Sequence, residues 1–203
     1  MYTETNIALD CPCCGESIYE SLSWFKKTYS TCPLCDKGLS ANQFASVISD
    51  LEKAMEIRAL TEAAGLKVAA YGSYYFLAGS ASKNRHAFET ILESAVALGA
   101  PLIRVWAGAK GSDKATEEDW QTAIADSRRI GDLAAKRGLK VAYEYHQGTL
   151  TDTTHSAVRL IKSVDHAAVS SFWQPPNGAE LENCCEGLKQ VINLNKLSSV
   201  HAF

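Results

Sequence analysis

The stretch LKVAYEYHQGTLTD, residues 139–152, decides the expected fold. Its first part has the β-branched and aromatic residues of a buried strand, among them Val141, Tyr143 and Tyr145. Side chains of a strand alternate between its two faces, so Glu144 and His146 lie together on the other face. An unpaired carboxylate inside a strand is costly, which makes Glu144 the strongest single candidate for a functional residue.

Four further strands are predicted along the chain, and helical stretches separate them. The strand starts lie about 30–40 residues apart, which is the length of a repeating βα unit. Because neighbouring parallel strands need a helical crossover, the alternation predicts an α/β fold with about five parallel strands. The other predicted strands are residues 66–72, 101–108, 168–174 and 198–203, and the predicted helices are residues 86–100, 117–138, 154–164 and 181–192.

Cysteines are concentrated near the N-terminus, where five of the seven lie within the first 35 residues. Four of these five form two C-x-x-C pairs, and two such turns bring four thiolates into a tetrahedral zinc shell. The alternatives are a redox-active C-x-x-C or plain buried thiols, and the paired arrangement favours structural zinc. Cys13 is the spare cysteine, because Cys11 and Cys14 have the better spacing. The predicted zinc ligands are Cys11, Cys14, Cys32 and Cys35.

The chain is thereby divided into three predicted parts. Residues 1–40 form the small zinc ribbon, which has no open coordination position and to which we assign no catalysis. Residues 41–65 form a bridging helix, because apolar residues recur there at helical spacing between a potential cap at Ser40 and Gly65. Residues 66–203 form the βα part.

Polar side chains occur at the predicted carboxyl ends of the strands, where function gathers in parallel α/β sheets. Gln174 and His201 end the last two strands and can converge on the face that carries Glu144. A carboxylate, an amide oxygen and an imidazole suit a divalent ion such as Mn, Mg, Co or Zn, so these three residues are the predicted metal ligands. Glu144 is also the predicted general base, and His146 is the second candidate for catalysis.

Three more residues at the strand ends are predicted to bind a substrate: Tyr74, Arg104 and Trp106. Each strand-end residue also has a purely structural explanation. Arg104 can pair with Glu144 inside the sheet, and Gln174 can satisfy loop backbone before Pro175. The joint occurrence of such residues on successive strands favours a functional site.

The composition limits the function further. The chain has 203 residues and a net charge of −3. It therefore lacks a positive electrostatic potential that would attract nucleic acid or anionic membranes non-specifically. No apolar run approaches the roughly 20 residues of a spanning helix, and the N-terminus lacks the features of a signal peptide. The sequence therefore predicts a cytoplasmic protein with no membrane partner.

Several segments together resemble the sugar phosphate isomerase/epimerase family, which has the xylose isomerase-like (AP endonuclease family 2) TIM barrel. The resemblance covers roughly residues 52–203, and the segments are YGSYY, FETILESAVALGAPLIRVWAG, LKVAYEYHQGTLTDT and SSFWQPPNG. The N-terminal part resembles the bacterial zinc ribbon, except that Asp36 stands after the second C-x-x-C pair where glycine is usual.

The resemblance implies a (β/α)₈ barrel with a divalent metal held at the strand ends by acidic residues and a histidine. Glu144 matches the first family glutamate, His201 matches the histidine, and Gln174 stands where an acid is usual. The five strands resemble strands two to six of the barrel, and the last family glutamate belongs to a strand beyond Phe203. We therefore expect an incomplete TIM-type barrel, either naturally rearranged, a fragment or a fusion, whose open edges a homodimer would cover.

The leading hypothesis is an enzyme, a metal-dependent isomerase or epimerase of a sugar or sugar phosphate, with activity reduced or lost in the incomplete barrel. The second hypothesis is a non-catalytic binding module, in which the ribbon recognises a protein or nucleic acid and the half-barrel is a scaffold. Lys26, Lys27 and Lys37 offer it only a small basic face that nearby acids offset. A third hypothesis is an endonuclease for abasic DNA, against which the acidic net charge argues.

Overall fold

The computed structural model describes residues 4–79, 83–176 and 178–201. By its contacts the chain divides into two compact units, which we describe separately. Unit 1 consists of Met1–Val68 with Glu89–Ala100, and unit 2 consists of Ala69–Phe88 with Pro101–Phe203. The predicted fold class is confirmed: an α/β chain with five parallel strands in one sheet and a cysteine cluster near the N-terminus.

Unit 1 begins with two short antiparallel hairpins, and each C-x-x-C pair lies in the turn of one of them. Strand β1 (Asn6–Asp10) pairs with β2 (Ser17–Ser21), and β3 (Ser30–Thr31) pairs with β4 (Gly38–Leu39). The one-turn helix α1 (Leu22–Phe25) connects the hairpins and is capped by the Ser21 side chain, which accepts a hydrogen bond from the backbone N–H of Trp24. The hairpins hold the four cysteines at their tips, as the prediction of a zinc ribbon requires.

The ribbon shares its hydrophobic core with the helix that follows it. After a short 3₁₀ turn, η1 (Ala41–Gln43), the helix α2 (Ala45–Ala63) buries Ile48, Leu51 and Met55 on one face. These side chains belong to the same buried cluster as the hairpin residues and Ala97 of helix α3 (Phe88–Leu98). Burial against α2 supplies apolar area that the small ribbon lacks, because a unit of its size cannot form a sufficient core alone.

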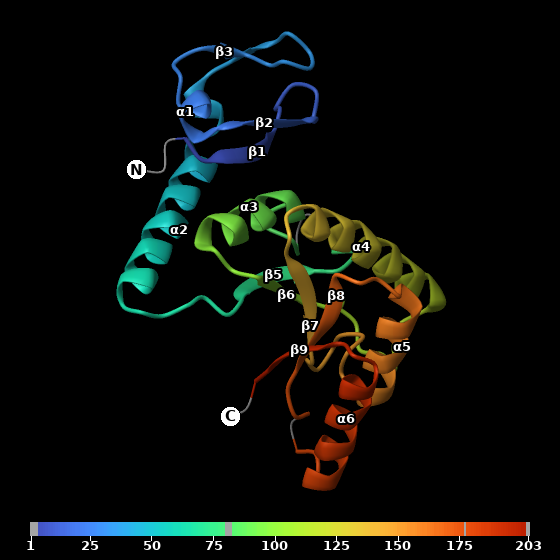
Figure 1. Cartoon of the computed structure of the whole chain (residues 1–203). Coiled ribbons are helices and arrows are strands. Elements are labelled where there is room, and N and C mark those ends of the chain that lie inside the picture. Colours follow the sequence, from blue (N-terminus) through green and yellow to red (C-terminus); the bar gives the residue numbers. More distant parts are fainter. Residues whose placement is uncertain (1–3, 80–82, 177, 202–203) are drawn as a thin grey trace. The chain divides into compact units, whose positions relative to one another are not determined.

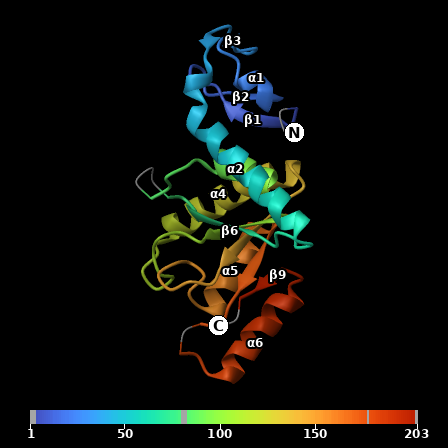
Figure 2. The same ribbon diagram turned by 90° about the vertical axis from the view of Figure 1, so that its left-hand side faces the viewer.

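Unit 2 is built on one five-stranded parallel sheet in which the spatial order of the strands follows their order in the sequence (Figures 1 and 2). Within the described residues, β5 and β9 form its two edges. The strands are β5 (Tyr71–Phe76), β6 (Leu102–Trp106), β7 (Lys140–Glu144), β8 (Val169–Trp173) and β9 (Leu197–Val200).

Within the described part of unit 2, three helices follow β6, β7 and β8, and two of them pack on the middle of the sheet. They are α4 (Glu117–Lys136), α5 (Thr154–Val164) and α6 (Leu181–Asn193). In Figure 1 both helices lie on the sheet: α4 contacts β7 and β8, and α5 contacts β8. Alternate strand residues are completely buried: Ile103, Val105, Val141 and Tyr143. By the two-residue period of a strand, Arg104, Trp106 and Glu144 face the opposite side.

The predicted helices agree with the structure, whereas the first predicted strand is wrong. Residues 66–70 do not form a strand, and β5 consists of Tyr71–Phe76. The YGSYY segment, which the prediction placed at the end of this strand, is therefore most of the strand itself. It pairs with β6, and the hydroxyl of Ser73 donates a hydrogen bond to the backbone carbonyl of Arg104 over 2.6 Å.

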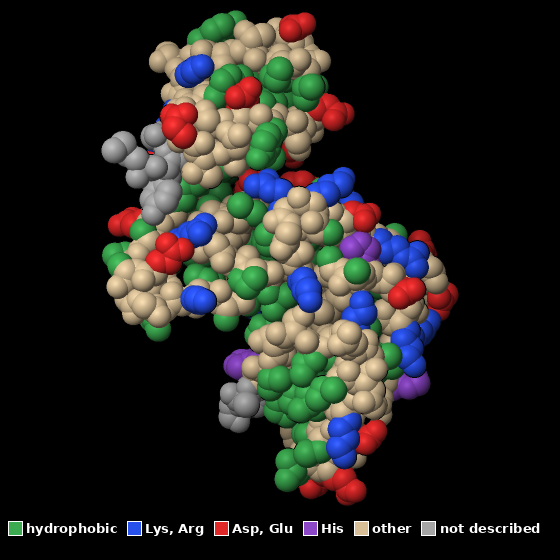
Figure 3. Space-filling view, in the orientation of Figure 1, with side chains coloured by type: hydrophobic (Ala, Val, Ile, Leu, Met, Phe, Trp, Pro, Cys, Tyr) green, Lys and Arg blue, Asp and Glu red, His purple; other side chains and the backbone are tan. Residues whose placement is uncertain are grey.

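Charged side chains of both signs are interspersed on the surface. Figure 3 shows lysine, arginine, aspartate and glutamate side chains next to each other over α4 and α5. Ion pairs such as Arg159–Glu117, with 2.7 Å between nitrogen and oxygen, account for part of this pattern. The face in this view therefore has no extended basic area of the kind that nucleic-acid backbones require.

Candidate active site

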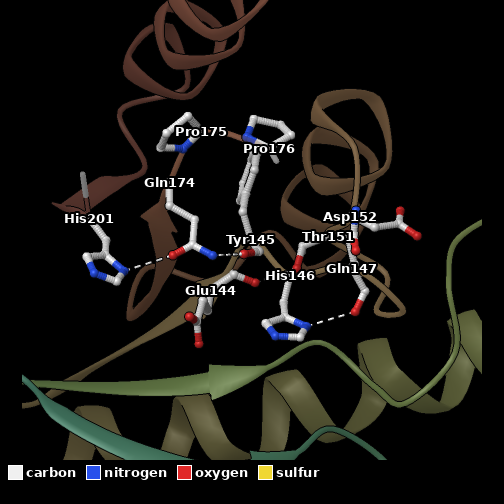
Figure 4. Close-up of a pocket in the computed structure, with 10 residues that line it drawn as sticks. All are labelled: Glu144, Tyr145, His146, Gln147, Thr151, Asp152, Gln174, Pro175, Pro176 and His201. Atoms are coloured by element: carbon white, nitrogen blue, oxygen red, sulfur yellow. Dashed lines mark hydrogen bonds between the residues drawn. The ribbon is translucent and has the colours of Figure 1, made fainter. Parts of the chain in front are cut away.

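A cavity of about 440 Å³ lies at the carboxyl ends of β7, β8 and β9. It is open to solvent at one side, and the close-up in Figure 4 shows side chains from the three strand ends converging on it. Four of the predicted site residues line it, which brings together groups separated by up to 57 positions in the chain. The lining residues are Glu144, Tyr145, His146, Gln147, Thr151, Asp152, Gln174, Pro175, Pro176 and His201.

Glu144 is held from β6 by two donors. The Arg104 guanidinium forms an ion pair with Oε2 of Glu144, and the indole Nε1–H of Trp106 donates to the same oxygen over 2.7 Å. The arginine and glutamate side chains are only 17% and 13% exposed. The structural explanation of Arg104 is thus correct, since it pairs with Glu144 inside the sheet.

Gln174 and His201 are neighbours at the ends of β8 and β9. His201 Nδ1 lies 2.9 Å from Oε1 of Gln174, while Nε2 of Gln174 donates to the backbone carbonyl of Tyr145 over 2.5 Å. Gln174 therefore satisfies backbone, as its structural explanation states, and also presents its amide oxygen to the histidine. Both side chains line the same cavity as Glu144.

His146 is fixed in one orientation beside Glu144. Its ring stacks on Trp106, with ring centroids 4.4 Å apart and planes inclined by 21°. Its Nδ1 lies 2.8 Å from the backbone carbonyl of Gln147, and a carbonyl only accepts hydrogen bonds, so we assign the proton of the neutral ring to Nδ1. The other nitrogen, Nε2, is then the basic one, which is the form required of a proton acceptor.

Tyr74 is the most exposed of the predicted substrate-binding residues, at 71%. Its ring meets the edge of Trp106 with centroids 5.8 Å apart, and the Arg104 guanidinium carbon lies 5.6 Å from its centroid. The three residues predicted to bind substrate therefore form one contiguous group, but Arg104 and Trp106 contact Glu144 directly.

Sequence reasoning missed the residues of the loop after β7 that line the cavity. Thr151 is buried and donates from Oγ1 to the backbone carbonyl of Glu144 over 2.6 Å. Asp152 accepts a hydrogen bond from the backbone N–H of Ser112 over 2.9 Å. The signal was present in the TDTT sequence, since a run of threonines and an aspartate before a helix is typical of an N-cap. Thr153 caps α5 and thereby fixes this loop.

The four predicted zinc ligands come together in unit 1. Ligand atoms of Cys11, Cys14, Cys32 and Cys35 all lie within 4.8 Å of one another, and Cys13 is outside this group. The backbone N–H groups of Cys13 and Leu34 each point at the first sulfur of a pair, at 3.4 Å from Cys11 Sγ and from Cys32 Sγ. The two turns also share a left-handed residue, Gly15 with φ 77° in the first and Asp36 with φ 57° in the second. Aspartate tolerates this conformation, so the departure from glycine does not alter the turn.

The four thiols of the cluster affect one another's protonation. Burial acts to raise the pKa of Cys11, but hydrogen bonds from the backbone of Cys14 and Cys13 outweigh it, and the pKa falls to about 6. The Lys37 backbone acts to lower the pKa of Cys35, but burial and the neighbouring thiols raise it to about 12. One thiolate thus suppresses ionisation of another, a conflict that a divalent cation held by all four thiolates would remove.

The strand-end residues fit a divalent ion less completely. Glu144, Gln174 and His201 supply a carboxylate oxygen, an amide oxygen and an imidazole nitrogen, a donor set suited to Mg, Mn or Zn. Within the described residues, however, the only close group of three or more cysteine, histidine or acidic ligands is the four cysteines. Glu144 supplies the single carboxylate of the strand-end set, and its charge is already balanced by Arg104.

Residues 36–201 match the sequence model of the xylose isomerase-like TIM barrel family, so the chain belongs to that family. Inosose dehydratase from Geobacillus thermodenitrificans is 34% identical over 88 residues, which cover 42% of this chain and 28% of the relative. The chain thus spans less than a third of the length of this curated relative.

Solved structures support the fold. The 3-keto-D-glucoside 4-epimerase from E. coli superposes with a TM-score of 0.62 at 20% identity, covering 75% of this chain and 65% of that one. A xylose isomerase-like TIM barrel protein from Mycobacterium smegmatis in complex with magnesium gives a TM-score of 0.59 at 19% identity, covering 74% of this chain and 55% of that one. Within the part of the chain that the structure describes, no helix is long and apolar enough to span a membrane.

Proposed function

We propose that the strand-end cavity is the active site of a metal-dependent enzyme that isomerises or epimerises a sugar or sugar phosphate. The observation that carries the proposal is the convergence of Glu144, His146, Gln174 and His201 on one cavity from neighbouring strand ends. Membership of a family whose relatives include sugar-modifying enzymes supports it. A small-molecule substrate would bind in this cavity.

Each residue has a role in this proposal that its surroundings support. Glu144, Gln174 and His201 would hold a divalent ion, which polarises a carbonyl oxygen of the substrate when bound. Where Glu144 does not ligate the ion, it removes a proton from the carbon next to that carbonyl. Nε2 of His146 is the other atom able to accept or return a proton. Tyr74 offers an exposed aromatic ring next to Trp106, on which the apolar face of a sugar ring can stack.

The direct test measures proton removal without requiring knowledge of the product. Purified protein is incubated with keto sugars and their phosphates in D₂O with Mn²⁺ or Co²⁺, and NMR follows deuterium entry next to the carbonyl. We expect exchange in the native chain and a loss of at least about 100-fold in Glu144→Gln, the size of a general-base contribution. Glu182→Gln makes the same chemical change at an exposed position of α6 and should leave exchange unaltered.

Two outcomes would contradict the proposal. Equal exchange in Glu144→Gln and in the native chain would remove Glu144 from the mechanism. Absence of exchange with every keto substrate, with both metals, would instead favour the non-catalytic binding module, for which the barrel is a scaffold.

Dehydration is the second candidate reaction, and the match to an inosose dehydratase favours it. Both reactions begin with removal of a proton next to a carbonyl, but dehydration then expels a hydroxyl group from the adjacent carbon as water. An isomer or epimer retains the mass of the substrate, whereas a dehydrated product is about 18 Da lighter, so mass spectrometry of the products separates the two.

For the cysteine cluster we propose a structural zinc ion with Cys11, Cys14, Cys32 and Cys35 as its ligands. The mutual distances of their ligand atoms and the closed set of four thiolates support this. A site of this kind contributes folding free energy and leaves no coordination position for a substrate.

A further inference from the structure

The contact between Arg104 and Glu144 is built into the register of the sheet. Parallel pairing places Trp106 of β6 opposite Glu144 of β7, and Arg104 two residues earlier on the same face. Both donors reach the same carboxylate atom, Oε2 of Glu144. The second oxygen, Oε1, accepts neither of these hydrogen bonds.

The strand on the other side of β6 makes room for the guanidinium. Gly72 of β5 is the register partner of Arg104, and a Cβ added to Gly72 would lie 2.9 Å from Nη2 of Arg104. Any larger residue at this position would therefore push the guanidinium away. Tyr74 covers the arginine from the same strand, with its ring centroid 5.6 Å from the guanidinium carbon. Arg104 is thus confined by β5 on one side and by Glu144 on the other.

Trp106 is confined in the same way. The ring of Phe76 meets it edge-on with centroids 4.7 Å apart, and His146 stacks on it at 4.4 Å. These two aromatic neighbours pack against the indole, and its N–H is directed at the carboxylate. Hydrogen bonds to an ionised group are also stronger than those between neutral groups.

We propose that Arg104 and Trp106 are positioning residues that together hold Oε2 of Glu144, so that Oε1 is the one atom Glu144 offers to the cavity. The inference rests on the proposed function, because Oε1 is the atom that would bind the metal or accept the substrate proton. It changes the role expected of the two residues: they act through Glu144 and do not bind the substrate directly. Glu144 consequently offers a divalent ion one oxygen and not two.

The charge of Arg104 has a measurable consequence for metal binding. A guanidinium next to the carboxylate repels a cation at the same carboxylate, and this repulsion is substantial at low local dielectric. Removing the charge in Arg104→Gln should therefore tighten Mn²⁺ binding at least about tenfold, because it removes repulsion and frees Oε2. Arg104→Lys keeps the positive charge, and with it the repulsion, so it should stay within about threefold of the native affinity.

The experiment has a first arm that requires no metal. The indole N–H of Trp106 gives one of four tryptophan side-chain signals in a ¹⁵N–¹H spectrum, and Trp106→Phe identifies it by its disappearance. We expect this signal to move in Glu144→Gln and in Gly72→Ala, which displaces the arginine without removing it. The exposed Glu182→Gln variant is the control. If the chemical shift of the Trp106 indole N–H is the same in Glu144→Gln as in the native chain, the inference is overturned. The proposed function is not affected by that result.

The second arm measures Mn²⁺ binding by the EPR signal of the free ion, with the ribbon loaded with zinc. Glu144→Gln should weaken binding and Arg104→Gln should strengthen it, with a changed Mn²⁺ spectrum in the latter because a second oxygen becomes available. Equal affinity and equal spectra in Arg104→Gln and the native chain would overturn the positioning role. If the native chain does not bind Mn²⁺, the metal site of the proposed function is overturned. The positioning role is then tested by the Trp106 indole signal of the first arm alone.

Discussion

Replacing Cys32 with serine will abolish zinc binding and unfold the two hairpins of unit 1. Cys32 is completely buried, and its sulfur accepts the backbone N–H of Leu34. Three thiolates no longer close a tetrahedral shell, and structural zinc in small domains provides apparent binding energies of about 10–16 kcal/mol at neutral pH. Loss of zinc measured by elemental analysis should coincide with loss of the dispersed NMR signals of residues 6–39.

The spare cysteine supplies the matched control for this prediction. Cys13 is exposed and lies in the same turn, but it does not belong to the group of four. Cys13→Ser should therefore keep one zinc ion per chain and a native spectrum. Full zinc occupancy in Cys32→Ser, or equal loss of zinc in both variants, would contradict the assignment of the four ligands.

Replacing Leu160 with alanine will destabilise unit 2 by about 2–5 kcal/mol, the range seen when a fully buried leucine is truncated. Leu160 lies in α5, is 0% exposed, and belongs to the helix that packs on β8. The surrounding helices and strands cannot collapse completely into the space of the lost side chain, so the cavity adds to the lost burial. Urea denaturation, followed by the fluorescence of the tryptophans, measures the change as a lower midpoint.

Leu181 provides the comparison for Leu160. It is the first residue of α6 and is 79% exposed, so its side chain buries little area on folding. Leu181→Ala should change the free energy of unfolding by less than about 0.5 kcal/mol, as is usual for surface positions. Similar denaturation midpoints for the two variants would show that α5 does not contribute to the core of unit 2.

Much of this fold was predictable because its local signals are strong. The helix at residues 154–164 was predicted with the bounds that the structure gives to α5, and the structure adds the Thr153 cap at its start. The strands around Val105 and Tyr143 were also predicted, because the buried face of each carries β-branched or aromatic residues. The two C-x-x-C pairs fixed the position of the cysteine cluster, since few other arrangements satisfy that spacing.

Other features depend on partners that a single segment does not reveal. The sequence at residues 66–72 has the composition of a strand. In the structure, however, β6 pairs with Tyr71 and residues after it, and not with residues 66–70. The side chains of the site were predicted by their place at strand ends, whereas their mutual contacts were not. Whether Arg104 contacts a substrate or Glu144 is decided by side-chain direction and by the space at Gly72, which are properties of three strands together.

The agreement between spatial and sequence order in the five-stranded sheet has a consequence for how this protein is made. Each new strand adds beside the one that left the ribosome just before it, so every step of sheet assembly closes a loop of only one βα unit. Short loops carry a small entropic penalty and favour rapid assembly. Unit 2 can therefore grow vectorially during translation, from β5 towards β9, without waiting for a distant segment to complete a pair.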